Sequence, residues 1–220
     1  MDIVHTVNAK HIVWDWNGTI LDDNEAVLAA VNAVCAGFGR EAITLAHWRE
    51  TFSRPLLACY ERLLEQPLTL EDWARIDSLY HDEYRGLLSI CRLAVGVPDH
   101  LHTWRAQGRT QSLLSMWFHS ELVPLVTEYG LSDLFARIDG LRESTDGGSK
   151  AEHLADHLAA QGLDPADVVL IGDVVDDAAA AAHVGAGCVL VTTGVMSRSA
   201  LAATGVPVAD SIPDALRYLV

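Results

Sequence analysis

The sequence predicts an α/β protein in which a doubly wound parallel sheet is interrupted by an α-helical domain. From residue 93 onward, short apolar runs of strand length alternate with helical segments. This alternation is typical of parallel strands joined by right-handed helical crossovers. Between residues 22 and 92, by contrast, apolar residues recur at helical spacing alone. We therefore expect a Rossmann-like core domain of residues 1–21 and 93–220 and a helical cap domain of residues 22–92.

The first strand is expected at Lys10 to Trp16, because Ile12, Val13 and Trp14 are β-branched or aromatic. The helical insert follows, with Thr69 as a start signal for its last helix. Its helices are expected at residues 25–38, 45–52, 55–64 and 70–89.

The second part of the core contains the alternating elements. Strands are expected at residues 110–115, near 138, and at 168–171, 188–191 and 206–208, and helices at 98–107, 119–129, 150–161, 176–184 and 213–219. The run Val168-Val-Leu-Ile171 is apolar throughout, as in a strand covered on both faces of its sheet.

Composition excludes several classes of function. The formal net charge is −15, so a surface that binds nucleic acid through its phosphates is disfavoured. No run of about 18 apolar residues predicts a membrane span, and the first residues lack the pattern of a secretory signal. The cysteines form no Cys-x-x-Cys pair, which favours buried thiols in a cytoplasmic protein over a zinc site. They are Cys35, Cys59, Cys91 and Cys188.

The stretch after the first strand carries the first candidate chemistry. Asp15 ends the apolar run, and Gly18 follows in a tight turn. The carboxyl end of a buried strand is the usual ligand site in an open α/β sheet. The turn amides of Trp16, Asn17 and Gly18 are positioned to form an anion-binding nest beside the carboxylate. A strand followed by an Asn-Gly turn is the alternative interpretation.

Three further segments carry polar residues at predicted strand or helix ends. Ser115 closes a strand, although a helix cap is the simpler interpretation. Lys150 starts a helix, where the helix dipole does not favour a cation, which hints at an anionic partner. Asp173 follows the apolar strand directly, with Asp177 four residues later. Clustered carboxylates beside Asp15 require a cation, and Mg²⁺ suits oxygen ligands.

These four segments, in this order, resemble the motifs of the haloacid dehalogenase-like superfamily. Asp-x-Asn-Gly-Thr resembles its first motif, Ser115 its second, Lys150 its third and Gly-Asp-x-x-x-Asp its fourth. The helical insert directly after the first motif makes the chain similar to phosphoglycolate phosphatase-like members. The resemblance implies a Rossmann-like core with a helical cap, Mg²⁺ dependence and small phosphorylated metabolites as substrates.

The resemblance also implies residue roles. Asp15 is the nucleophile that forms an aspartyl-phosphate, and Ser115 and Lys150 stabilise the transferring group. Asp15, the Asn17 carbonyl and Asp173 hold Mg²⁺, with Asp177 (or, as a second choice, Asp176) orienting a metal-bound water or Lys150. Substrate contacts are expected from the first-motif turn, the insert and the second motif, at Trp16, Gly18, Thr19, Arg54, Ser115 and Met116.

Asn17 departs from the pattern, because the family's phosphatases have a general acid–base aspartate there. An amide cannot shuttle a proton, so hydrolysis of ordinary phosphate esters should be slow by roughly 10²- to 10⁴-fold. The alternative is a catalytically impaired phosphate- or metabolite-binding protein on the same scaffold.

Several weaker signals have competing interpretations. Trp16 lines the entrance to the site or packs in the core, and Arg54 contacts a substrate anion or is solvated. His153 and His157 have the i,i+4 spacing of a metal pair, but a solvated helix face is the favoured interpretation. A monomer and a homodimer are both compatible with the sequence.

Overall fold

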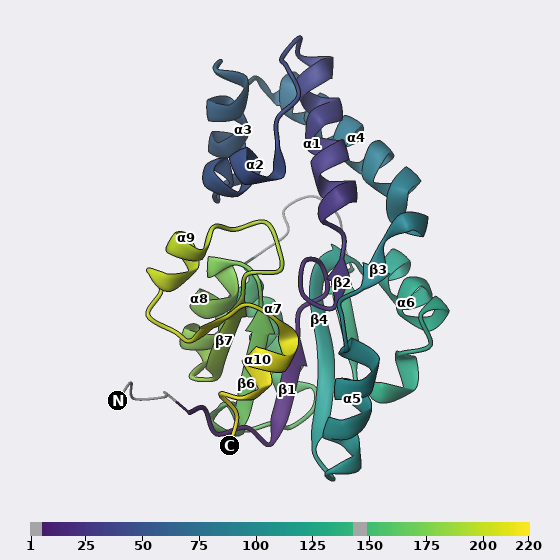
Figure 1. Ribbon diagram of the computed structural model, residues 1–220, viewed down its shortest axis with the longest axis vertical. Helices are drawn as coiled ribbons and strands as arrows, with labels where there is room; N and C mark the ends of the chain where they lie inside the picture. Colours follow the sequence, from purple (N-terminus) through teal and green to yellow (C-terminus); the bar gives the residue numbers. More distant parts are fainter. Residues whose placement is uncertain (1–5, 143–148) are drawn as a thin grey trace. The chain divides into compact units, whose positions relative to one another are not determined.

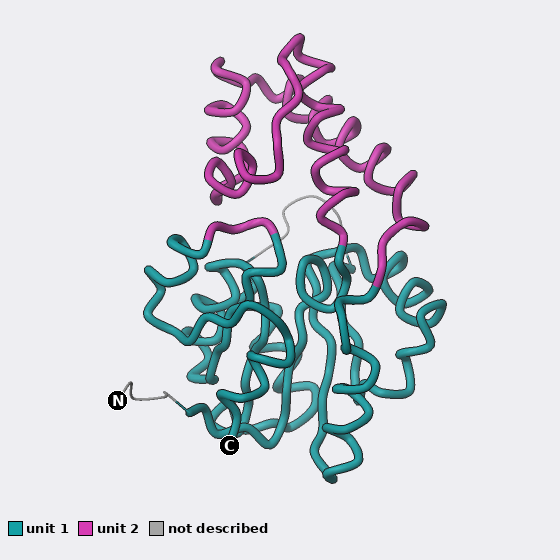
Figure 2. The backbone as a smooth tube through the Cα atoms, viewed as in Figure 1, with its two compact units in different colours: residues 1–22, 93–194, 198–220 teal, residues 23–92, 195–197 magenta. Residues whose placement is uncertain are grey.

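The computed structural model describes residues 6–142 and 149–220, which form two compact units (Figure 2). The core unit comprises the chain up to Asp22, Leu93–Gly194 and Arg198–Val220, and the helical unit comprises Asp23–Arg92 with Val195–Ser197. The sequence placed the helical domain at residues 22–92, without the short segment 195–197. No helix among the described residues is long and apolar enough to cross a membrane.

The core unit is built on one sheet of six strands, all parallel, which confirms the predicted α/β fold class (Figure 1). The strand order is β5-β4-β1-β6-β7-β8. The bounds are β1 His11–Trp14, β4 Thr110–Phe118, β5 Ile138–Leu141, β6 Val168–Gly172, β7 Gly187–Val191 and β8 Val208–Ala209. The apolar run of β6 is fully buried, as a strand covered on both faces requires.

The chain changes direction across the sheet between β1 and β6. After β1 the next strands of this sheet, β4 and β5, are added on one side, whereas β7 and β8 follow β6 on the other. Ligands in such sheets bind outside the carboxyl ends of the strands at this switch point. Asp15 directly follows β1, and Asp173 directly follows β6.

Helices cover both faces of the sheet. Neighbouring residues of β4 point to opposite faces: the Gln111 side chain donates to the carbonyl oxygen of Leu101 in α5, whereas the Ser112 hydroxyl contacts His157 of α7. α8 packs beside α7, and α6 contacts β4 and β5. The core helices are α5 Val97–Ala106, α6 His119–Glu128, α7 Lys150–Ala159, α8 Val175–Val184, α9 Arg198–Ala202 and α10 Ile212–Leu216, with 3₁₀ turns at Ser132–Leu134 and Pro165–Asp167.

The helical unit is held by its own apolar and aromatic core. α1 packs along α4, and the buried Tyr84 hydroxyl donates to Asp23 over 2.6 Å. Thr69 and Asp72 form a capping box at the start of α4, which the sequence indicated. The elements are α1 Asn24–Gly37, α2 Leu45–Thr51, α3 Leu56–Leu64, α4 Leu70–Leu87 and a 3₁₀ turn at Leu88–Ile90.

Some elements differ from expectation. β4 continues to Phe118, three residues beyond the predicted end at Ser115, and its register to β5 shifts between Leu114 and Phe118. A second small sheet pairs β2 (Leu21–Asp22) with β3 (Arg92–Leu93). These two-residue strands were missed because they are too short to show alternation. The first strand and the helix starting at Lys150 are shorter than predicted by two or three residues at their ends.

Candidate active site

Asp15 is held at the carboxyl end of β1 by the sheet and by its own turn. Its backbone N–H donates to the carbonyl oxygen of Ile171 in β6 at 2.9 Å, and its side chain is buried. The backbone N–H of Trp16 donates to its carboxylate, as expected for a nest of turn amides. The turn requires a left-handed residue, which Gly18 supplies with φ of +68°. The Thr193 hydroxyl donates to the Gly18 carbonyl and ties the turn to the end of β7.

Lys150, the first residue of α7, is buried and pairs with two carboxylates. Its Nζ lies 2.5 Å from Asp15 Oδ1 and also pairs with Asp177 Oδ1. Burial opposes the charged form, but the two carboxylates outweigh it and raise the pKa of the Lys150 ammonium above its usual value. The cation therefore tolerates a helix start because local carboxylates neutralise it. The part of the third motif that precedes Ser149 lies outside the described residues.

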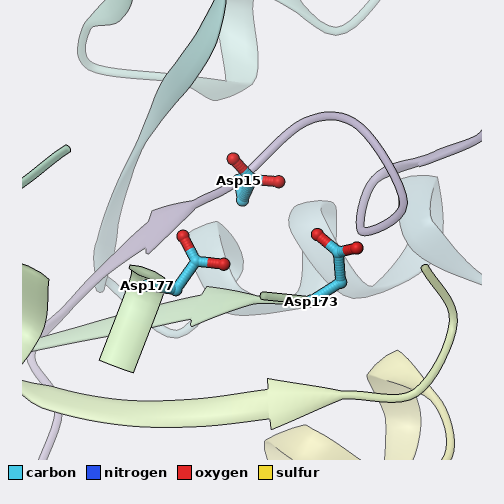
Figure 3. Close-up of side chains that lie close together, drawn as sticks. All are labelled: Asp15, Asp173 and Asp177. Atoms are coloured by element: carbon cyan, nitrogen blue, oxygen red, sulfur yellow. The ribbon is translucent and has the colours of Figure 1, made fainter. Parts of the chain in front are cut away.

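Three buried carboxylates converge at this edge of the sheet (Figure 3). Asp15, Asp173 and Asp177, here called the acidic cluster, each offer an oxygen within 4.8 Å of the others. Asp177 is fully buried and accepts the Val174 N–H at 3.0 Å, whereas Asp176 is half-buried and outside the cluster. Of the two aspartates left open by the sequence, Asp177 is the one beside Asp15.

The charge of the acidic cluster fits a divalent metal ion. Burial raises the pKa of Asp15 to about 6, with a further contribution from Asp177 and an opposing one from Lys150. Three carboxylates face one ammonium group, so ionising all of them leaves an excess of negative charge in a buried site. A hard cation with oxygen ligands, such as Mg²⁺, would remove that excess. Lys150 pairs with both Asp15 and Asp177, so its single charge offsets only part of that excess.

Glycine backbone makes room for these carboxylates. A Cβ atom on Gly194 would lie 1.7 Å from Asp173 Oδ2, and one on Gly18 would lie 2.6 Å from the same atom. Likewise, a Cβ atom on Gly172 would lie 2.1 Å from Asp177 Oδ2. Gly194 was not singled out as a site residue; the only signal was its place in a turn directly after a buried strand.

Ser115 and Asn17 contact each other beside the acidic cluster. The Ser115 hydroxyl donates to Asn17 Oδ1 over 3.4 Å and accepts the Trp117 backbone N–H at 3.0 Å. Ser115 is buried and half-buried Asn17 borders it, so the residue that departs from the family pattern lies among the other candidate residues.

The remaining candidate substrate contacts differ in their burial. Trp16 is fully buried with its ring 6.0 Å from that of Tyr129, which favours the core-packing interpretation over an entrance. Thr19 is fully buried and Met116 half-buried, both on core-unit segments that flank the site. Arg54 is exposed in the helical unit, so its contact with a substrate stays a prediction.

The interpretation of His157 as part of a solvated helix face was wrong. His157 is 1% exposed, and its two ring nitrogens contact Asp139 and Ser112. His153 is half-buried on the same helix. No cluster of metal-ligating side chains other than the acidic cluster occurs among residues 6–142 and 149–220.

Comparisons with known proteins agree with the geometry. A model of the haloacid dehalogenase-like hydrolases matches residues 9–185. The chain is 28% identical over 194 residues to a phosphoglycolate phosphatase of Synechococcus elongatus, covering 87% of this chain and 88% of that protein. It is 25% identical over 203 residues to a phosphoglycolate phosphatase of Caulobacter vibrioides, covering 88% and 84%.

Solved structures share the fold. A haloacid dehalogenase-like hydrolase from Streptococcus pneumoniae superposes with a TM-score of 0.80 at 18% identity, covering 96% of this chain and 98% of that one. A structure described as a predicted phosphoglycolate phosphatase from Haemophilus somnus gives a TM-score of 0.74 at 20% identity, covering 95% and 97%.

Proposed function

Because the chain belongs to the haloacid dehalogenase-like hydrolases, we propose that it hydrolyses small phosphorylated metabolites through a phosphorylated Asp15. The observation that carries the proposal is the buried ion pair of Lys150 with Asp15, at 2.5 Å, inside the acidic cluster. A buried carboxylate next to an ammonium group can act as a nucleophile toward an anionic phosphoryl group, because the cation offsets their repulsion.

The proposed reaction has two displacements at phosphorus. An Asp15 carboxylate oxygen forms a bond to phosphorus while the bond to the substrate's leaving oxygen breaks, and that oxygen takes a proton from solvent. Water then attacks the same phosphorus and gives up a proton to solvent, while the bond between phosphorus and the Asp15 oxygen breaks; inorganic phosphate leaves and the carboxylate is restored. Lys150 and the turn amides stabilise the charge on the phosphoryl oxygens in both steps. When bound by Asp15, Asp173 and the Asn17 carbonyl, Mg²⁺ would add positive charge at the phosphoryl group.

Asn17 sets the expected limit on rate. Its amide accepts the Ser115 hydroxyl and cannot deliver a proton to the leaving oxygen. We therefore expect slow hydrolysis of alkyl phosphates, by roughly 10²- to 10⁴-fold relative to a site with an aspartate there. Acyl and aryl phosphates should be affected least, because their leaving groups need little protonation.

The same residue favours a second candidate function, that of a phosphate- or metabolite-binding protein that does not hydrolyse its ligand. Such a protein would keep Lys150, the turn amides and Asp173 for binding an anion with its metal. Trapping a phosphate mimic on Asp15 does not separate the two candidates, because both would bind it.

The identity of the substrate, the cellular location and the oligomeric state are also proposals. The curated relatives are phosphoglycolate phosphatases, so phosphoglycolate, with its alkyl leaving group, is the first compound to test. We propose that Arg54 of the helical unit contacts the substrate's second anionic group, and that the protein acts in the cytoplasm as a monomer or homodimer.

The decisive experiment is multiple-turnover release of inorganic phosphate with and without Mg²⁺. Phosphoglycolate and an acyl phosphate are compared in the wild-type chain, Asn17→Asp and the nucleophile control Asp15→Asn. We expect Mg²⁺-dependent turnover that Asp15→Asn abolishes, with a gain of roughly 10²-fold or more on phosphoglycolate in Asn17→Asp.

Each arm can contradict a separate part of the proposal. Turnover that persists in Asp15→Asn would refute the assigned nucleophile. An unchanged rate on phosphoglycolate in Asn17→Asp would refute the role given to position 17. No turnover of either compound by the wild-type chain would favour the binding protein.

A further inference from the structure

A chain of hydrogen-bonded polar side chains runs from the exposed Thr110 through the core to the buried Asp139. His11 Nδ1 lies 2.7 Å from Thr110 Oγ1, and His11 Nε2 lies 2.7 Å from Ser112 Oγ. Ser112 Oγ lies also 2.7 Å from His157 Nε2, and His157 Nδ1 lies 2.7 Å from Asp139 Oδ2. We call these five residues the hydrogen-bond chain. It joins β1, β4, α7 and β5, and none of its members belongs to the proposed reaction.

Asp139 fixes the direction of the hydrogen bond at its own end of this chain. The carboxylate accepts bonds from His157, Arg137 and Arg142; these outweigh burial and hold the pKa of Asp139 well below its usual range, so it is ionised. His157 Nδ1 therefore donates to Asp139. The Ser112 hydroxyl contacts both imidazole rings, and it can donate to one ring while it accepts from the other. Burial, with a smaller contribution from the neighbouring His157, lowers the pKa of His11 to about 4, so His11 is neutral at pH 7.

His157 and Lys150 lie on the same stripe of α7. The buried residues of this helix are Lys150, Leu154, His157 and Leu158, which face the sheet. Seven residues separate Lys150 from His157, which is two helical turns or about 10 Å along the axis. The position of the ammonium group is therefore tied to the position of the imidazole by a rigid helix.

The two leucines alone would leave the helix free to slide. Apolar burial is non-directional, whereas hydrogen bonds require a defined distance and angle. His157 makes two such bonds, one to β4 and one to β5, the strand at the edge of the sheet. Since a cation at a helix start gains nothing from the dipole, the place of Lys150 depends on its two carboxylate partners and on how the rest of the helix is anchored.

We propose that His157 is a positioning residue, which fixes α7 to Ser112 and Asp139 so that the Lys150 ammonium is held between Asp15 and Asp177. The consequence for catalysis rests on the proposed function, but the position of Lys150 does not. The first test therefore measures Lys150 directly, and the second measures turnover.

The direct test uses the scarcity of lysine. The full chain contains only Lys10 and Lys150, so NMR of protein labelled with ¹³C and ¹⁵N in lysine gives two side-chain signals. Lys10 is 72% exposed and serves as an internal reference for the 4% exposed Lys150 side chain. We expect a slowly exchanging Lys150 ammonium signal, distinct from that of Lys10, in the wild-type chain. His157→Leu should move it toward the Lys10 signal and speed its exchange.

The matched control is Leu158→Ala, which weakens the same buried stripe of α7 without touching the hydrogen-bond chain. We expect it to lower the thermal midpoint while leaving the Lys150 signal in place. A Lys150 signal that stays in place in His157→Leu, or that moves equally in both variants, would overturn the inference. Should His157→Leu fail to fold, His157→Gln, which retains an amide to bond one of the two partners, takes its place with the same criterion.

The kinetic test is phosphate release with Mg²⁺ by the same variants. We expect His157→Leu to lower kcat by about 10- to 100-fold with KM nearly unchanged, and Leu158→Ala to leave kcat nearly unchanged. An unchanged kcat in His157→Leu would overturn the catalytic consequence. If the wild-type chain shows no turnover, the proposed function fails. The NMR test still decides whether His157 fixes the position of Lys150.

Discussion

Two buried groups of charged and polar side chains share the same secondary-structure elements but differ in charge balance. Asp15 of the acidic cluster directly follows β1, which begins with His11 of the hydrogen-bond chain, and on α7 Lys150 lies seven residues before His157. In the hydrogen-bond chain, the single carboxylate of Asp139 faces two guanidinium groups and an imidazole. In the acidic cluster, three carboxylates face one ammonium group.

The difference indicates what each group is for. A buried network in which each polar group has a hydrogen-bond partner specifies one packing of the elements that it joins. A buried excess of like charge costs stability and is kept where a ligand completes it. The comparison therefore predicts opposite responses when one carboxylate is neutralised in each group.

The largest expected difference is between Asp139→Asn and Asp173→Asn in the metal-free protein. Asp139→Asn leaves the buried His157 and two solvent-accessible guanidinium groups without their carboxylate, so we expect the free energy of unfolding to fall by about 2–3 kcal/mol. Asp173→Asn removes an excess charge and should leave that free energy within about 0.5 kcal/mol or increase it. Urea unfolding in the presence of a chelator measures both. Equal losses in the two variants would remove the distinction between the groups.

A smaller effect is expected from Gly194→Ala, which tests how tightly the acidic cluster is packed. The added Cβ would overlap Asp173 Oδ2, so the carboxylate must move and the proposed metal site with it. We expect Mg²⁺-dependent phosphate release to fall by about 10- to 100-fold. Gly86→Ala is the matched control, because its Cβ would meet no atom within 4 Å. Similar rates in the two variants would show that the position of Asp173 tolerates displacement.

The smallest effect is the loss of stability at acidic pH that is caused by His11 of the hydrogen-bond chain. The pKa of His11 is lowered to about 4 in the folded protein from 6.5, so the unfolded chain binds a proton first as the pH falls. The stability contribution of neutral His11 is thus complete above pH 6.5 and is lost as the pH falls toward 4.

When the pH falls from 7.5 to 5, the free energy of unfolding of the wild-type chain should fall by about 2 kcal/mol more than that of His11→Asn. Urea unfolding at the two pH values measures the difference. The exposed His183 provides the control His183→Asn, in which the free energy of unfolding should change with pH as it does in the wild-type chain. Parallel slopes for all three proteins would refute a buried neutral His11.

Much of the fold could be predicted from the sequence because its signals are local. The continuous apolar run of β6 identifies a strand buried on both faces, and Gly172 and Asp173 mark its end without tertiary information. The same holds for Asp15 after β1. That Lys150 has an anionic partner was predictable because a lysine at a helix start conflicts with the dipole, and the structure supplies Asp15 and Asp177 as its partners.

The hydrogen-bond chain could not be predicted, because its bonds join residues that are distant in sequence. His157 has the same local context as a solvated histidine, and only the positions of Ser112 and Asp139 reveal its burial. Trp16 presents a similar difficulty, since a turn residue beside a site is exposed or buried according to what packs over it, here Tyr129. Gly194 was hidden for the same reason: its neighbour Asp173 belongs to another strand end.

The two ends of the described chain meet beside the amino end of the sheet. The Val7 N–H donates to the Tyr218 carbonyl at 2.7 Å, and the Val220 N–H donates to the Val7 carbonyl at 3.0 Å. Since Asp15 and Asp173 follow the carboxyl ends of β1 and β6, this junction lies at the opposite edge of the sheet from the acidic cluster. Attachment to a solid support through either end should therefore leave the reactive edge open to solutes.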